Sequence, residues 1–208
     1  MTYPALTVRQ KNIYRFSGFL VKPAFSVVFA LLMAISANAF IYLPFTPVPV
    51  TLQVLTVIFS ALTLGGSWAL ASQILYISMG LAGLPVFAGF LGGPAVFTGP
   101  TGGYIIGFAL AAFLAGSIFR SRSVYRALKG NGLAVALVSG ILGLMVIYIM
   151  GGIHLFGFLN HLYGGEPFTE TIRSVWIMGI SPFIIPDAVK VAAAVIILRP
   201  GINGYEDN

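Results

Sequence analysis

One carboxylate and one amine lie inside a long apolar stretch near the end of the chain. Asp187 follows Pro186, and Lys190 comes three residues later. On a helix these two side chains share a face, and Asp187 would lie in the first turn, where the helix dipole favours negative charge. If the stretch crosses a membrane, either charge near the bilayer centre costs about 2.5–3.5 kcal/mol. Two interpretations follow: an internal ion pair that tightens the structure, or a polar site where the carboxylate accepts N–H groups and the amine donates to an oxygen.

A glycine-rich segment, 83–102, carries a second group of candidate residues. Its glycines permit close backbone approach, and Phe87 and Phe90 offer apolar faces. The segment contains no Lys or Arg, so we do not expect it to bind phosphate. We interpret it as an ordered loop over an apolar ligand; the alternative is a surface or re-entrant loop with aromatic side chains at the interface. Gln53, near the start of another apolar stretch, would either bond a neighbouring helix or contact a ligand.

The composition places these residues in a membrane protein. The 208 residues are 58% hydrophobic and only 8% charged, whereas a soluble domain carries about 25% charged residues. The mean hydropathy of +0.98 excludes a water-soluble globule, because too little polar surface exists to cover one. No GxxxxGK[ST] phosphate loop is present. Work against a gradient would therefore draw its energy from another subunit or from a coupled ion.

Other function classes are disfavoured by residue type. Lys and Arg total 11 against 5 acidic residues, a formal charge of +6. The basic residues flank apolar stretches, which fits control of membrane topology better than binding to nucleic acid. The chain has no cysteine and only two histidines, so we expect no disulfide and no metal site. Neither histidine nor Asp187 shows a nucleophile–base spacing, and we expect no catalysis.

Six apolar stretches are separated by polar or glycine-rich segments. The second and third, at 15 residues each, reach only about 22 Å, less than the ~30 Å hydrocarbon core. They could instead form one long helix kinked at Gly65-Gly66. The stretches lie approximately at 24–43, 50–64, 67–81, 103–119, 133–153 and 175–198.

The basic residues favour six membrane-spanning helices over five. With six, the basic residues before the first stretch, those in 120–129 and Arg199 all face one compartment. We therefore predict an all-α integral protein of the cell membrane with six transmembrane helices and both termini cytoplasmic. Residues 1–23 would form a basic cytoplasmic segment, 24–198 the six-helix membrane domain with an outer loop at 83–102, and 199–208 a short tail. Residues 154–174 would be a further irregular outer segment.

Four motifs occur in a specific order along the chain. They are PVPVTLQ at 47–53, GLPVFAG at 83–89, GPTGGY at 99–104 and PDAVK at 186–190. In this combination the chain resembles the BioY family, the biotin-binding S-components of energy-coupling factor (ECF) transporters, over approximately residues 25–198. The resemblance implies a six-helix protein that captures biotin from outside, powered by a transmembrane coupling subunit and two ATPase subunits.

The resemblance also assigns residues. It implies that Asp187 and Lys190 contact biotin, with Lys190 at either the ureido group or the valerate carboxylate. It implies that Ala30 and Ala34, a small-residue face of the first helix, dock on the coupling subunit; from the residues alone that face packs either inside the bundle or on a partner. Between 81 and 119 no charged or amide residue occurs. The predicted binding residues are Asp187, Lys190, Gln53, Phe87, Phe90, Thr98, Thr101 and Tyr104.

Two alternative functions remain open from the sequence. One is an S-component for a different vitamin. The other is a secondary carrier driven by protons, in which Asp187 would take up and release the proton. Neither alternative needs a resident cofactor. In the biotin-binding interpretation, biotin is the transported ligand and not a cofactor.

Overall fold

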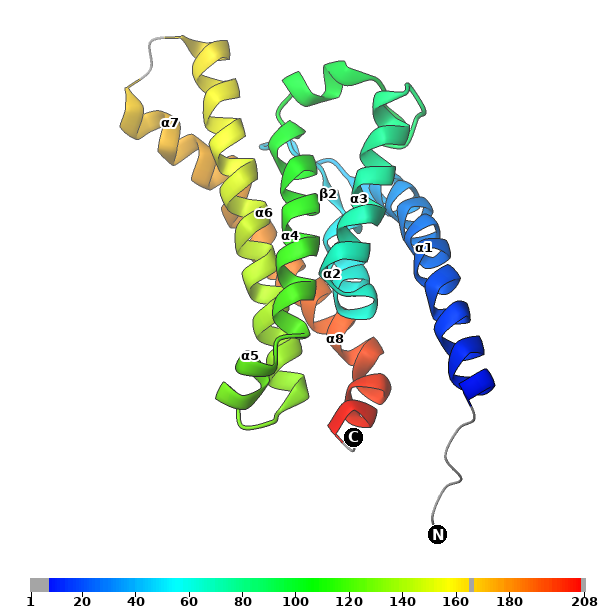
Figure 1. Cartoon of the computed structure of the whole chain (residues 1–208). Coiled ribbons are helices and arrows are strands. Elements are labelled where there is room, and N and C mark those ends of the chain that lie inside the picture. Colours follow the sequence, from blue (N-terminus) through cyan, green and yellow to red (C-terminus); the bar gives the residue numbers. More distant parts are fainter. Residues whose placement is uncertain (1–7, 165–166, 207–208) are drawn as a thin grey trace.

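The computed structural model describes residues 8–164 and 167–206, and these are predominantly helical. The helices form an elongated bundle in which α4 and α6 run side by side, α1 lies beyond α3, and α8 packs against α2 and α6 (Figure 1). The α-helices are α1 (Val8–Asn38), α2 (Gln53–Leu64), α3 (Gly66–Leu81), α4 (Gly102–Phe119), α5 (Arg122–Ala127), α6 (Gly132–Tyr163), α7 (Phe168–Val175) and α8 (Ile184–Glu206).

Five short elements lie between these helices. Strands β1 (Phe40–Ile41) and β2 (Val50–Thr51) pair antiparallel, with Phe40 opposite Thr51, and so tie the end of α1 to the start of α2. A 3₁₀-helix, Pro94–Thr98, lies within the glycine-rich loop. Between α7 and α8 the chain passes through a π-helix, Trp176–Ile180, and a 3₁₀-helix, Ser181–Phe183.

The described residues include four helical segments that are long and apolar enough to cross a membrane: Val21–Asn38, Gly102–Phe119, Gly132–Tyr163 and Phe168–Arg199. The chain is therefore a mostly helical membrane protein. Helices α2 and α3, with 12 and 16 residues, are only about 18 and 24 Å long. Nine of the twelve residues of α2 are buried among other helices. Because α2 contacts mainly protein and not lipid, it does not have to span the full hydrocarbon core.

A helix break at Gly65 separates α2 from α3, and the single kinked helix considered above is wrong. Gly65 has φ +80°, which a residue with a side chain rarely adopts, and its N–H donates to Ala61 O at 3.0 Å. A Cβ on Gly66 would overlap the Ser117 hydroxyl of α4. The glycines thus permit both the reversal and the close approach of α4.

Several helices extend beyond the apolar stretches that the sequence indicates. Helix α1 already begins at Val8, α6 continues to Tyr163 through residues expected to be irregular, and α8 continues to Glu206 through most of the expected tail. The extension of α6 is stabilised by packing, because Leu155 and Leu159 remain buried there. The last apolar stretch is not one helix, since the π- and 3₁₀-turns interrupt it before α8.

The small-residue face of α1 packs within the bundle. Ser26, Ala30, Met33 and Ala37 form a buried stripe at helical spacing, and Ser26 Oγ donates to Trp68 O of α3 at 2.9 Å. Ala30 is only 2% exposed, so it is already covered by this chain's own helices. Ala34 is half-buried beside it. Docking of a coupling subunit on this face of α1 stays a prediction.

Candidate binding site

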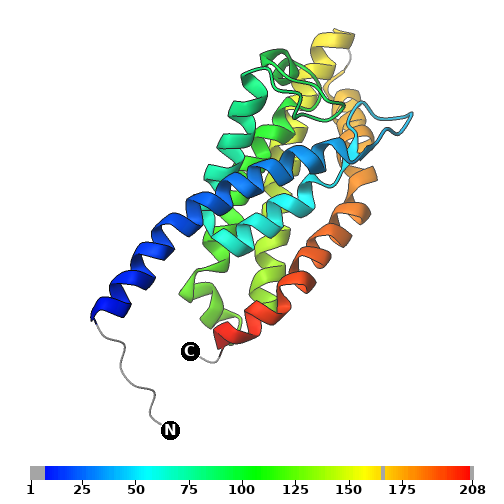
Figure 2. The same ribbon diagram turned by 90° about the vertical axis from the view of Figure 1, so that its right-hand side faces the viewer.

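A cavity of about 400 Å³ is lined in part by the glycine-rich loop. That loop lies at the end of the bundle opposite the start of α1 and the end of α8 (Figure 2). Its volume is within the range of small-molecule sites, about 300–1,000 Å³. Residues from five parts of the chain line it. They are Tyr42 and Pro47–Pro49 before β2, the β2–α3 residues Thr51, Gln53, Val54 and Tyr76, the loop residues Phe87, Ala88, Leu91, Gly92, Ala95, Val96, Gly99, Pro100 and Thr101, the α4 and α6 residues Tyr104, Ile105, Phe108, Ile147 and Tyr148, and finally Phe183, Asp187 and Lys190.

The interrupted last helix positions the charged pair. Because α8 begins only at Ile184, Asp187 lies in its first turn, where the helix dipole favours negative charge. Asp187 is 3% exposed, and Lys190 Nζ donates to its Oδ1 at 2.7 Å. Both side chains line the cavity. The two interpretations of the sequence are thus combined: the residues form an ion pair, and that pair is part of the cavity wall.

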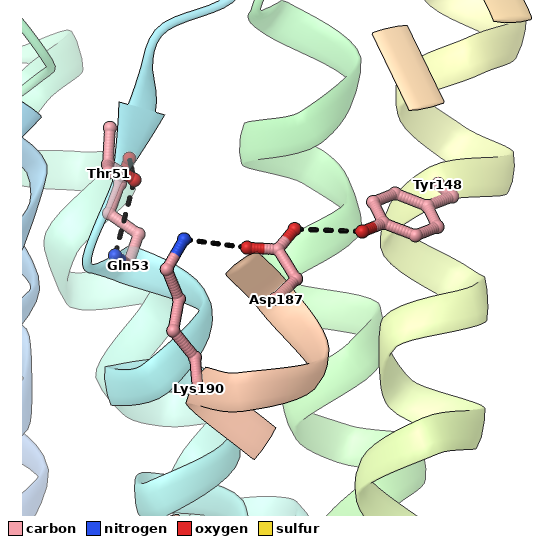
Figure 3. Close-up of polar contacts among 5 residues, drawn as sticks. All are labelled: Thr51, Gln53, Tyr148, Asp187 and Lys190. Carbon is pink, nitrogen blue, oxygen red and sulfur yellow. Dashed lines mark hydrogen bonds and ion pairs between the residues drawn. The ribbon is translucent and has the colours of Figure 1, made fainter. Parts of the chain in front are cut away.

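Tyr148 of α6 completes the environment of Asp187. Its hydroxyl donates to Asp187 Oδ2 at 2.9 Å, so each carboxylate oxygen accepts one hydrogen bond from a different side chain (Figure 3). Sequence reasoning missed Tyr148, because a single tyrosine in the apolar stretch 133–153 carries no local signal of a polar contact. Only the packing of α6 against α8 places it beside Asp187.

A second polar group comes from the start of α2. Gln53 is buried, and its side-chain nitrogen donates to the Tyr76 hydroxyl at 3.0 Å. The Thr51 hydroxyl donates to Gln53 Oε1 at 3.1 Å and accepts from the Gln53 backbone N–H at 3.2 Å. Gln53 therefore both bonds a neighbouring helix, through Tyr76, and lines the cavity. In Figure 3 Gln53 lies on the Lys190 side of Asp187, away from Tyr148.

The glycine-rich loop covers the cavity with aromatic side chains. Phe87 is 1% exposed and packs edge-to-face against Tyr76 and Phe97, with ring centroids 5.5 and 5.7 Å apart. The ring lies against Gly80 of α3, where a Cβ would overlap it. The backbone N–H of Phe90 donates to Asn38 Oδ1 at 2.7 Å, which fastens the loop to the end of α1. This agrees with the predicted ordered cover.

Two predicted contact residues of the loop, Phe90 and Thr98, lie outside the cavity lining. Phe90 is 67% exposed and has φ +58°, a backbone conformation that turns the chain away after Phe87. Thr98 is exposed at the end of the 3₁₀-helix, where its hydroxyl donates to Ala95 O at 2.8 Å. Neither residue lines the cavity.

Thr101 and Tyr104 were predicted as cavity residues, and both line it at the start of α4. Tyr104 is buried, and its hydroxyl donates to Gly179 O of the π-helix at 2.8 Å. Gly151 of α6 leaves room for the Tyr104 ring, since a Cβ there would overlap it. His154 of α6 makes a 2.9 Å hydrogen bond with Gly99 O, which holds the preceding loop in place.

The arrangement combines an apolar enclosure with a few polar groups at one side. Lys190 uses one of its three N–H donors on Asp187, and the two Asp187 oxygens retain free lone pairs. The Gln53 amide nitrogen likewise keeps one free N–H. The cavity can therefore accept N–H groups and donate to an oxygen at the same place, while the remaining wall contacts apolar surface. In the described part of the chain, no three His, Asp or Glu side chains approach closely enough to hold a metal ion.

Comparisons with known proteins agree on one family. The model of the BioY family matches residues 10–206. The probable biotin transporter BioY of Pyrococcus horikoshii is 41% identical over 162 residues, 78% of this chain and 85% of that protein. The biotin transporter BioY of Thermotoga maritima is 40% identical over 166 residues, 79% and 88% of the two chains. The 2.1 Å crystal structure of the S-component for biotin from an ECF-type ABC transporter superposes with a TM-score of 0.70, at 26% identity and 94% coverage of both chains.

Proposed function

The chain belongs to the BioY family, and from this membership and the cavity we propose that it takes up biotin as the substrate-capture (S) subunit of an ECF-type transporter. The observation that carries the proposal is the Asp187–Lys190 ion pair in the wall of a mostly apolar cavity. Charged residues within a membrane-spanning region are retained chiefly for function.

The chemistry of biotin complements this wall. Its ureido group offers two N–H donors and one carbonyl acceptor, and its bicyclic ring and valeryl chain are apolar. We infer that Asp187 accepts a ureido N–H and Lys190 donates to the ureido carbonyl, because the ion pair is neutral overall and presents both functions side by side. Phe87 and the other apolar residues of the loop would then enclose the ring.

The membrane arrangement and the partners form the second part of the proposal. The protein would lie in the cell membrane with six transmembrane helices, both termini cytoplasmic and the loop 83–102 outside. Consistent with this, the beginning of α1, the basic α5 segment and the end of α8 lie at one end of the bundle, and the loop lies at the other (Figure 1). A transmembrane coupling subunit and two ATPase subunits would supply energy, so that this chain needs neither catalysis nor a cofactor of its own.

Titration calorimetry of the detergent-purified protein with biotin tests the function directly. We expect saturable binding to one site per chain. Lipoate, which shares the valerate chain but lacks the ureido group, should not compete. Thiamine and riboflavin are titrated in the same way, as vitamins that an S-component of different specificity would bind. Binding of one of these in place of biotin, or the absence of biotin binding by folded protein, would refute the proposal.

Two substitutions locate the site. We expect Asp187→Asn and Lys190→Ala each to weaken biotin binding at least tenfold, which corresponds to about 1.4 kcal/mol. Glu170→Gln is the matched control, because the Glu170–Arg173 pair has the same i,i+3 spacing but is exposed, with N and O 3.9 Å apart. Unchanged affinity in both pair variants would place the ligand elsewhere.

A further inference from the structure

We propose that Tyr148 is a positioning residue of the binding site: its hydroxyl holds the Asp187 carboxylate in the orientation that accepts an N–H group of the ligand. This inference rests on the proposed function. It assigns a role in ligand selection to a residue of α6 that neither the chain's motifs nor its charge pattern indicates.

The geometry around Asp187 requires a contact from outside its own helix. Lys190 lies three residues further along α8 and reaches Oδ1 through a flexible four-carbon chain. Such a donor can follow the carboxylate as it rotates, so it does not fix the orientation. Tyr148 reaches Oδ2 from α6 at 2.9 Å, with a rigid ring that has only two side-chain torsions. The two donors together therefore define one orientation of the carboxylate.

The remaining hydrogen-bonding capacity of Asp187 then points at the cavity. An ionised carboxylate has about four acceptor positions, and Tyr148 and Lys190 occupy one on each oxygen. Asp187, Lys190 and Tyr148 all line the cavity. Without the Tyr148 hydroxyl, the carboxylate can turn both oxygens toward Lys190, and a ligand N–H must compete with the ammonium for them.

A double-mutant cycle on the full-length protein separates positioning from direct contact. We expect Tyr148→Phe to weaken biotin binding about tenfold. In an Asp187→Ala background the same substitution should have less than a twofold effect, because the group that it orients is gone. Equal losses in both backgrounds would show that the hydroxyl contacts biotin on its own, and the positioning role would be wrong.

A ligand-side comparison covers the case in which Asp187→Ala does not fold. Biotin and an analogue methylated on both ureido nitrogens are titrated against the wild-type and Tyr148→Phe proteins. Tyr148→Phe should narrow the preference for biotin over the analogue, because that preference depends on the N–H acceptor. An unchanged preference would overturn the inference.

Tyr163→Phe is the matched control, since it removes an exposed hydroxyl from the same helix. It should leave the affinity and the thermal stability unchanged, and a loss equal to that of Tyr148→Phe would attribute the effect to α6 in general. The two proposals fail differently. If the wild type does not bind biotin, the proposed function is wrong; if the wild type binds and Tyr148→Phe binds equally well, only the role of Tyr148 is wrong.

Discussion

Asp187 and Lys190 have hydrogen-bond and ion-pair partners within the protein itself, without a ligand. The pair, with Tyr148, keeps two charges in the bundle without leaving either uncompensated. Removal of one partner from a buried ion pair costs about 3–5 kcal/mol, because the other charge is left alone. Lys190→Ala and Asp187→Asn are therefore expected to lower thermal stability as well as affinity, and the binding measurements require variants that are shown to be folded.

Gln73 presents the opposite situation at the residue scale. This side chain of α3 is completely buried outside the cavity lining, and its nitrogen donates only to Ser72 Oγ at 3.3 Å. Its Oε1 atom has no hydrogen-bond partner among the described residues. Neither the interhelical bond nor the ligand contact that a membrane glutamine suggests is formed here. A buried acceptor without a donor reduces stability by about 1–3 kcal/mol.

We predict that Gln73→Leu raises the stability of the ligand-free protein by about 1 kcal/mol or more, because leucine has similar size and no polar group to satisfy. Thermal unfolding of the detergent-purified protein measures the change, and biotin affinity should stay within twofold. Gln53→Leu is the contrasting variant, since it removes the bond to Tyr76 and a cavity-lining amide. A lower unfolding temperature for Gln73→Leu would contradict the prediction.

At the scale of elements, the contact between α3 and the loop determines whether the cavity is closed. The Phe87 ring occupies the space that a side chain at residue 80 would need. The carbonyl of Gly80 also accepts from the Gly83 and Gly93 N–H groups at 3.0 and 2.7 Å, so the same residue anchors both ends of the loop's first part. The end of α3, at Gly80, is thus the contact that holds the glycine-rich loop over the cavity.

We predict that Gly80→Ala displaces Phe87 from the cavity and weakens biotin binding about tenfold or more, because the ring is rigid and has close neighbours on its other sides. Gly157→Ala of α6 is the control, since a Cβ there meets no atom within 4 Å. Calorimetry gives the affinities, and thermal unfolding shows whether both variants are folded. Equal affinities for Gly80→Ala and the wild type would show that the packing of Phe87 against Gly80 is not needed for biotin binding.

At the scale of the whole molecule, the described helices are of very unequal length. Helix α6 has 32 residues, while α2 has 12 and is largely enclosed by other helices. In the proposed orientation the short α2–α3 hairpin turns at Gly65 on the cytoplasmic side. There Arg120 Nη2 donates to Thr63 O at 2.8 Å and joins the hairpin to the end of α4.

Single cysteines test this topology cleanly, because the natural sequence has none. We predict that a membrane-impermeant maleimide labels Thr169→Cys in intact cells, and labels Ser67→Cys and Ser123→Cys only after permeabilisation. All three positions are exposed. Ser67 is the second residue of α3 and lies beside the turn at Gly65, so its labelling from outside would show that the α2–α3 hairpin does not cross the membrane. External labelling of Ser123→Cys would reverse the proposed orientation.

The sequence alone determined the class of protein and the charged part of the site. Its apolar composition required a membrane, and charged residues within an apolar stretch required a partner or a use. The spacing of Asp187 and Lys190 placed them on one helical face, and the structure confirms their contact. The break at Gly65-Gly66 was visible as a possibility, although local sequence did not distinguish a kink from a reversal.

The tertiary structure decided which other side chains reach the cavity. Phe87 and Phe90 are alike in type and lie three residues apart in an irregular loop, where no helical or strand period assigns a face. Phe87 is buried because its ring packs against Gly80, which has no side chain to exclude it. Phe90 has a positive φ and its side chain is exposed. Tyr148 and Tyr76 acquire their roles only because α6 packs against α8 and α3 against α2. These contacts join residues 39 and 23 positions apart in the chain, so local sequence patterns contain no information about them.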